Sequence, residues 1–151
     1  MNKLNVYCTI KRNETMGTYM AVAGEQILSF SDEDTTTTLT NTVLWGGSGS
    51  PYPTPSGGPW KVQLINEHPK FGRCFKVLSD KESDIFIHFA RALSYGCFIL
   101  PITEEGKKFF RILLDTFGEF VVVQNEIKDE RTEEEKSENV IDYSKLKKWI
   151  G

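Results

Sequence analysis

Cysteine and histidine are scarce in this chain. Its 151 residues include three cysteines, Cys8, Cys74 and Cys97, and two histidines. An odd and sparse set of cysteines does not make a disulfide framework. No two of them stand at metal-ligand spacing, and two histidines do not complete a zinc site. We therefore expect no metal and no cofactor, and we expect buried thiols wherever a cysteine takes no part in chemistry.

Long hydrophobic runs and an excess of one charge are absent as well. No apolar run approaches the roughly 18 residues that suggest a membrane helix, and the first residues lack the apolar segment of a signal peptide. The net charge of −3 gives no reason to expect nucleic acid as a partner. These absences predict one soluble domain with no membrane span, synthesised in the cytoplasm.

Strand patterns are what the sequence has in quantity. In the first of them, Leu4, Val6, Cys8 and Ile10 alternate on one face with period two. We expect two more strands at 17–24 and 25–31, joined at Gly24–Glu25. Residues 32–59, rich in Thr, Ser, Gly and Pro, predict a long loop, within which 35–38 can add a short β segment. Later strands are expected at residues 60–66, 73–79, 84–89, 96–101 and 119–127.

Helical patterns come late in the chain. Thr103 is a candidate N-cap, and an apolar face follows it up to Phe117. The predicted class is therefore α+β, mainly β, with a central antiparallel sheet or sandwich, one main helix at about 103–117 and a short C-terminal helix. We expect one domain over 1–127, a solvated charged linker over 128–138, and a helix over 139–151 that docks on the domain.

The stretch DIFIHFARALSYGCFILP, residues 84–101, holds one histidine and one cysteine in two apolar runs. If these runs close a symmetrical hairpin, His88 faces Cys97 on one side of the sheet, with Cβ atoms about 5 Å apart. A slip of one residue would separate them, so this interpretation depends on register. The alternative is that both are satisfied core residues.

An imidazole beside a thiol is what nucleophilic cysteine chemistry requires. The imidazole can take the thiol proton and stabilise the thiolate. Gly96 permits a close approach of a substrate carbonyl, and the backbone N–H groups of Cys97 and Gly96 are candidates for an oxyanion site. Ser94 and Tyr95 carry hydroxyls that could orient the imidazole or hold substrate. Trp45, beside the Gly/Pro-rich segment, could stack on a sugar or peptide.

The segment SYGCFILP, with IHF upstream of it and TPSGGPWKV further upstream, resembles the signature of the L,D-transpeptidase (YkuD-like) superfamily. It is most similar to the compact L,D-transpeptidase-like effectors of type VI secretion systems. The resemblance covers about residues 54–123. It implies an L,D-transpeptidase-like fold, Cys97 as nucleophile, His88 as base and Ser94 as a supporting residue.

The same resemblance implies a reaction and a partner. Cys97 would attack a peptidoglycan stem peptide and form a thioester, which an amine or water then resolves, so the enzyme would be a transferase or a hydrolase. Larger members of the family carry a histidine and an arginine where this chain has Tyr95 and Phe98. Arg91 or Arg73 could replace that arginine in binding the substrate carboxylate.

Three functions stay open at this point. The first is a bacterial cell-wall enzyme, delivered as an antibacterial toxin to the periplasm of a target cell, with a cognate immunity protein or a secretion-system carrier as partner. The second is a non-catalytic module of a phage or secretion system that keeps the scaffold. The third is a cysteine hydrolase or amidase with another substrate. The second predicts a Cys97 that is buried and unreactive, whereas the first and third share the dyad.

Overall fold

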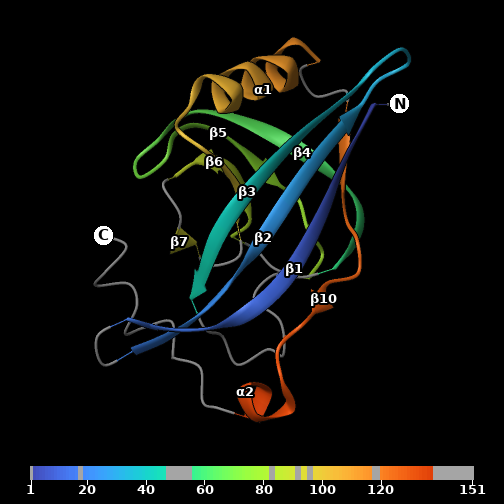
Figure 1. The fold of residues 1–151 in the computed structure, drawn as a ribbon. Coiled ribbons are helices and arrows are strands. Elements are labelled where there is room, and N and C mark those ends of the chain that lie inside the picture. The colour runs from blue at the N-terminus through green and yellow to red at the C-terminus, as the bar shows by residue number, and fades with distance from the viewer. Residues whose placement is uncertain are drawn as a thin grey trace.

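The computed structural model describes residues 2–16, 19–46, 56–81, 84–90, 93–94, 97–116 and 120–137, and it is mainly β (Figure 1). One long helix and one short helix accompany the strands. The strands are β1 (Asn2–Met16), β2 (Tyr19–Ser31), β3 (Thr36–Gly46), β4 (Gly57–His68), β5 (Gly72–Val77), β6 (Phe86–Phe89), β7 (Leu93–Ser94), β8 (Phe98–Leu100), β9 (Phe120–Gln124) and β10 (Lys128–Asp129). The helices are α1 (Glu104–Asp115) and α2 (Glu133–Ser137).

One mixed sheet joins these strands in the order β7-β3-β2-β1-β9-β4-β5-β6-β8, with β10 paired to β1 off this path. The hairpins β1–β2, β2–β3 and β4–β5 are antiparallel, whereas β1–β9, β3–β7 and β6–β8 are parallel. The β1–β10 pair is parallel as well, so the expectation of an antiparallel sheet is wrong for these four pairs. Parallel neighbours cannot be joined by a tight turn, and residues 90–97, which include β7, connect β6 to its parallel neighbour β8.

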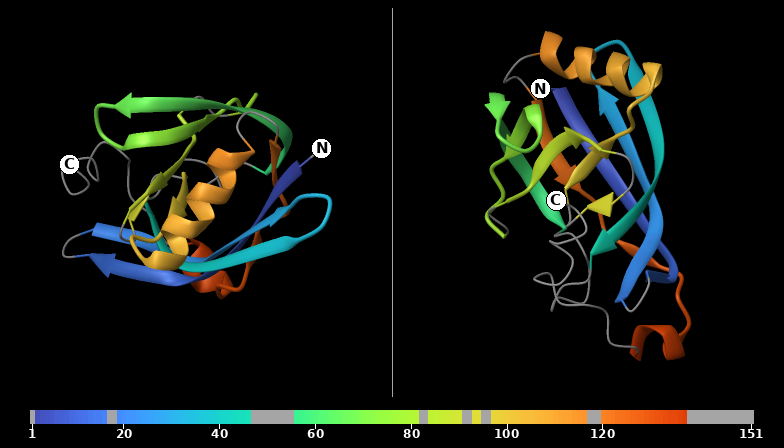
Figure 2. Two further views of the ribbon diagram at one scale, coloured as in Figure 1. Left: turned by 90° about the horizontal axis from the view of Figure 1, so that it is seen from above. Right: turned by 90° about the vertical axis from the view of Figure 1, so that its left-hand side faces the viewer.

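The sheet curls so that β1, β2 and β3 form one wall and β4 and β5 the other, with α1 lying across the gap between them (Figure 2). The alternation predicted for the first strand is confirmed, because Leu4, Val6, Cys8 and Ile10 are all buried. Edge-to-face aromatic contacts cross the interior: the Phe120 ring lies 5.8 Å from that of Phe30 and 5.4 Å from that of Phe75. The core therefore fills the space between the two walls.

Two of the predicted strands, 17–24 and 25–31, are one continuous strand. β2 pairs with β1 along its whole length, and a bulge between Ile10 and Arg12 absorbs the change of register near Gly24. A Cβ atom at Gly24 would lie 2.1 Å from the Thr9 carbonyl oxygen and 2.6 Å from the Trp45 ring. The glycine that was interpreted as a turn is therefore needed for close packing.

Two other segments are more ordered than the sequence predicts. The expected loop at 32–59 contains the eleven-residue β3, although residues 47–55 lie outside the described chain. The expected linker at 128–138 contains β10 and α2. The Arg131–Asp129 ion pair there, 2.8 Å long, is almost fully buried.

Helix α1 begins where the sequence predicts. Thr103 is the N-cap, and its hydroxyl accepts a hydrogen bond of 3.1 Å from the Gly106 backbone N–H. The helix ends at Asp115 instead of residue 117. Its apolar face buries Phe109, Phe110 and Leu113 against the sheet. The second predicted helix, at 139–151, lies outside the described residues.

The two ends of the curled sheet meet at Ile99 of β8. Gln26 and Asn41 face each other across β2 and β3, and both are buried. The Ile99 N–H donates to the Gln26 side-chain carbonyl at 2.8 Å, and the Ile99 carbonyl accepts from the Asn41 amide at 2.8 Å. We call this pair of side chains the amide clamp. It takes the place of a second backbone partner, on the side of β8 opposite to β6.

No helix among the described residues is long and apolar enough to cross a membrane.

The amide clamp yields a stability prediction. Asn41→Leu keeps the size of the side chain but leaves the buried Ile99 carbonyl without its donor, so we expect the free energy of unfolding to fall by about 1–3 kcal/mol. Urea denaturation measures the change. Gln63→Leu makes a similar amide-to-leucine change at an exposed position of β4 and should alter stability by less than about 0.5 kcal/mol. Equal effects of the two substitutions would contradict the role of the clamp.

Candidate active site around His88 and Cys97

His88 lies on β6, which is paired with β5 on one side and β8 on the other. The β6–β8 pair is parallel, and its register sets Ile87 against Phe98 and His88 against Ile99. The predicted symmetrical hairpin is therefore wrong. The chain leaves the end of β6 and returns to its beginning, so Cys97, just before β8, lies level with Phe86 and not with His88.

This parallel register still keeps His88 and Cys97 near each other. They are diagonal neighbours on adjacent strands, for which ideal strand geometry gives Cα positions about 8 Å apart. Both also border Phe71. The Phe71 ring stacks on the His88 ring at 3.8 Å between centroids, and Phe71 packs against the cluster of Cys74, Phe86 and Cys97. The structure therefore brings the predicted base and nucleophile into one region by a route the sequence does not predict.

The His88 imidazole is buried and held in one tautomer. Its Nδ1 lies 2.9 Å from the Phe89 carbonyl oxygen. Because a carbonyl oxygen only accepts, Nδ1 carries the proton, and the Nε2 of a neutral ring then has a free lone pair. Burial lowers the pKa of His88, and the charges of His68 and Lys70 lower it further. A neutral ring with an available Nε2 is the form that a general base requires.

The Cys97 thiol is held as a neutral group at rest. Its Sγ accepts a hydrogen bond from the Phe86 backbone N–H at 3.4 Å and donates to the Asp84 carbonyl at 3.5 Å. The residue is only 5% exposed, and burial raises the pKa of the thiol from 9.0 to about 11. A thiolate therefore forms here only when a base removes the proton.

His68 and Phe71 also border the site, although the sequence motif around Cys97 does not predict them. The turn between β4 and β5 is held by the His68 Nδ1, which accepts from the backbone N–H groups of Lys70 and Phe71 at 3.1 Å each. The rings of His68 and Phe71 stack at 4.7 Å, so Phe71 stacks on both histidines. His68 is the last residue of β4 and borders this turn. Only the fold shows that this turn lies against His88.

Cys74 is a third member of this region. It is buried on β5 and shares a contact cluster with Phe86 and Cys97. Two strand spacings separate Cys74 from Cys97, because β6 lies between β5 and β8. That distance, about 9–10 Å, exceeds the Cα separation that a disulfide bridges, and all three cysteines are free.

Several other predicted site residues are not brought to His88. Trp45 is 0% exposed and belongs to the hydrophobic core, so the prediction that it binds substrate is wrong. Arg73 is exposed, and alternation along β5 places it with Phe75 and not with Cys74. Ser94 belongs to β7, where it pairs with Trp45 of β3. The remaining candidates lie outside the described residues: Arg91, Tyr95 and Gly96.

The groups in this region are those that proton transfer from a thiol to an imidazole would require, and they lie on adjacent strands or next to them. Among the described residues, no group of three His, Cys, Asp or Glu side chains is arranged to hold a metal ion. The region instead contains one neutral imidazole, two neutral thiols and aromatic rings. It therefore suits covalent catalysis by cysteine or, if the thiol is never ionised, a purely structural role.

Comparisons with known proteins assign no family to this chain. No family model, no curated protein and no solved structure matches it. The resemblance of residues 54–123 to the L,D-transpeptidase superfamily therefore stays a prediction. Any function has to be argued from the geometry around His88 and Cys97.

Burial of the Cys97 thiol predicts a pH dependence of stability. Between pH 9 and 11 the unfolded chain releases the thiol proton while the folded chain keeps it, so the free energy of unfolding falls as pH rises. Urea denaturation of the wild type and Cys97→Ala measures this contribution. We expect the stability difference between them to change by roughly 1 kcal/mol from pH 8 to pH 10, in the direction that weakens the wild type. A constant difference would contradict a buried neutral thiol.

Proposed function

We propose that this protein is a cysteine-dependent acyltransferase or peptidase of L,D-transpeptidase type, with peptidoglycan stem peptides as substrates. The observation that supports this most is the state of His88. Its Nδ1–H is bound to the Phe89 carbonyl, which leaves the Nε2 lone pair as the proton acceptor, and Cys97 immediately precedes the adjacent strand β8. A histidine kept only for packing does not need a fixed tautomer on the face that Cys97 shares.

The proposed reaction begins with a neutral thiol and a neutral imidazole. His88 takes the Cys97 proton at Nε2, and the sulfur attacks the carbonyl carbon of a peptide bond in the stem. The tetrahedral intermediate collapses to a thioester when the leaving amine takes the proton from the imidazolium. An amine acceptor or water then attacks the thioester and releases Cys97. Because burial favours the neutral thiol, proton transfer to His88 and attack on the substrate would be coupled.

The substrate places this activity outside the cytoplasm. We propose delivery to the periplasm of a target bacterium, as an antibacterial effector. The producing cell would then need a cognate immunity protein, and a secretion-system carrier would move the effector. The motif resemblance around Cys97 supports this part of the proposal.

A second candidate is the non-catalytic module of a phage or secretion system. The observation that favours it is the burial of Cys97, together with a thiol pKa of about 11 and two backbone partners for its sulfur. These are the properties of a satisfied core cysteine. The two candidates differ in one measurable property, which is whether Cys97 ever forms a covalent bond with a substrate. The third function, a cysteine hydrolase or amidase with another substrate, shares this step and differs only in what it accepts.

Substitution of the proposed dyad tests the enzyme. Cys97→Ala should abolish turnover of purified tetrapeptide muropeptides, followed by liquid chromatography and mass spectrometry. His88→Gln should reduce it by at least about 100-fold, because general-base catalysis contributes on the order of 10²–10⁴. Intact-mass measurement should show an acyl adduct on wild-type protein incubated with muropeptides or a carbapenem.

Cys74→Ala is the matched control, because it removes a buried thiol from the same cluster without touching the proposed nucleophile. It should keep the adduct and most of the turnover. Full activity of Cys97→Ala, or an adduct that persists in it, would exclude the proposed nucleophile. A folded wild type with no adduct and no turnover would favour the non-catalytic module. Turnover of other amides or esters through Cys97, with muropeptides untouched, would favour the third function.

A further inference from the structure

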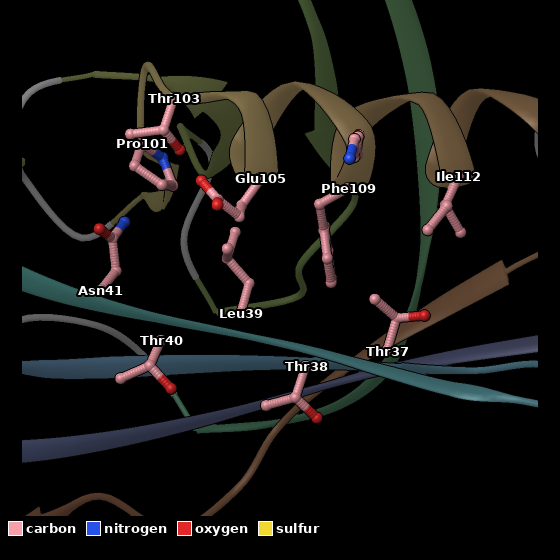
Figure 3. A pocket seen from close by; sticks show the side chains of 11 residues that line it. Thr37, Thr38, Leu39, Thr40, Asn41, Pro101, Thr103, Glu105, Phe109 and Ile112 are labelled. Carbon is pink, nitrogen blue, oxygen red and sulfur yellow. The ribbon is translucent and has the colours of Figure 1, made fainter.

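A groove lies between β3 and helix α1, on the seam where the curled sheet is not closed by backbone pairing (Figure 3). Its volume is about 560 Å³, within the range of ligand sites in proteins. Residues 37–41 of β3 form one side, and Pro101, Thr103 and α1 form the other. The amide clamp, through Asn41 and Ile99, bridges the seam at one end of this groove.

The β3 side of the groove is an open sheet edge. β3 pairs with β2 through all eleven of its residues, but on its outer edge the described strands pair only with Leu44 and Trp45, through β7. The turn bond from the Asp32 N–H to the Thr35 carbonyl fixes the hydrogen-bond alternation of this hairpin. Counting from that bond, the backbone N–H and C=O groups of Thr36, Thr38 and Thr40 point away from β2, toward the open edge.

The sequence of this edge strand lacks the charges and prolines that protect many natural sheet edges. Residues 36–46 read TTTLTNTVLWG and contain no charged residue and no proline. The side chains of Thr38 and Thr40 are exposed and lie on the side of β3 away from α1, while Leu39 points toward the helix (Figure 3). The strand therefore meets the groove with its backbone, with the apolar side chain of Leu39 and with the polar side chains of Thr37 and Asn41. Free backbone groups in a row select a partner that is itself an extended backbone.

Helix α1 adds two charges to the rim. Glu105 and Lys108 line the groove, and neither forms an ion pair with any residue in the described part of the chain. The apolar side chains of Phe109 and Ile112, further along α1, line the same groove. An occupant that complements this surface has apolar side chains on its inward face, together with a basic one toward Glu105 and an acidic one toward Lys108.

We propose that the edge of β3 at Thr36–Thr40 binds an extended segment of a partner protein by strand addition, with the inward side chains of that segment lying under α1. A second copy of this chain, paired through its own β3, fits less well. Residues 36–46 would bring no charge to either Glu105 or Lys108. The proposal is independent of the chemistry at Cys97.

Two synthetic heptapeptides test the proposal. They are Ac-Val-Thr-Lys-Thr-Glu-Thr-Val-NH₂ and the same peptide with Lys and Glu exchanged, because an edge accepts either strand direction. We expect at least one to bind ¹⁵N-labelled full-length protein. Binding should shift the backbone amides of Thr38 and Thr40 and slow their hydrogen exchange.

Substitution of Thr38 separates backbone pairing from other contacts. Thr38→Pro removes the outward N–H, and proline is tolerated where that N–H faces solvent, so the fold should survive. It should weaken peptide binding at least tenfold, whereas Thr38→Val, which keeps the N–H, should bind as the wild type does. Circular dichroism and thermal unfolding show whether both variants are folded.

Peptide variants keep the test decisive if Thr38→Pro fails to fold. Successive N–H groups of a strand point to opposite sides, so N-methylation of the odd-numbered or of the even-numbered peptide residues should leave only one of the two forms able to bind. Binding by both methylated forms, or unchanged binding to folded Thr38→Pro, would overturn the proposal. The proposal would also be overturned if neither of the two unmodified peptides bound. A dimer of the chain that excludes the peptide, seen by analytical ultracentrifugation, would overturn it in favour of a second copy.

Discussion

The hydrogen bonds of Gln26 and Asn41 to the Ile99 backbone are the constraint on which this structure depends. β8 is three residues long and has a backbone partner, β6, on one side only. On its other side two side-chain amides satisfy the peptide groups of its central residue. A buried peptide group without partners is costly, so this clamp holds β8 against the opposite wall of the sheet. It thereby sets the position of Cys97, two residues before Ile99.

The region around His88 and Cys97 follows from the parallel β6–β8 pair. Both strands are short and buried, so the thiol and the imidazole that they carry are buried with them. Burial acts on the two groups in opposite directions: it raises the pKa of Cys97 and lowers that of His88. Both groups are therefore neutral at rest. In the proposed reaction a proton would pass between them only when a product of that transfer is stabilised, and a bound substrate carbonyl would provide this stabilisation.

Local patterns predict several elements well, because those elements depend on local physics. The alternation from Leu4 to Ile10, the Thr103 cap and the apolar face of α1 need only period, capping and dipole arguments. Prediction from the sequence fails where tertiary contacts determine the local structure. Gly24 has the local character of a turn, but packing against Thr9 and Trp45 makes it part of a strand. Trp45 stands beside a Gly/Pro-rich segment, yet its ring is buried in the core.

The sequence by itself determined the chemistry available to this protein: few thiols, two imidazoles, no metal-ligand spacing, and a His–Cys pair within ten residues. It could not determine the direction of β8, because a short apolar run pairs equally well in either direction by pattern alone. Only the tertiary structure decided that direction, since the crossover geometry and the amide clamp from β2 and β3 select the parallel register. The same curling of the sheet left the edge of β3 open beside α1. The threonines of β3 show no local pattern that would predict this open edge.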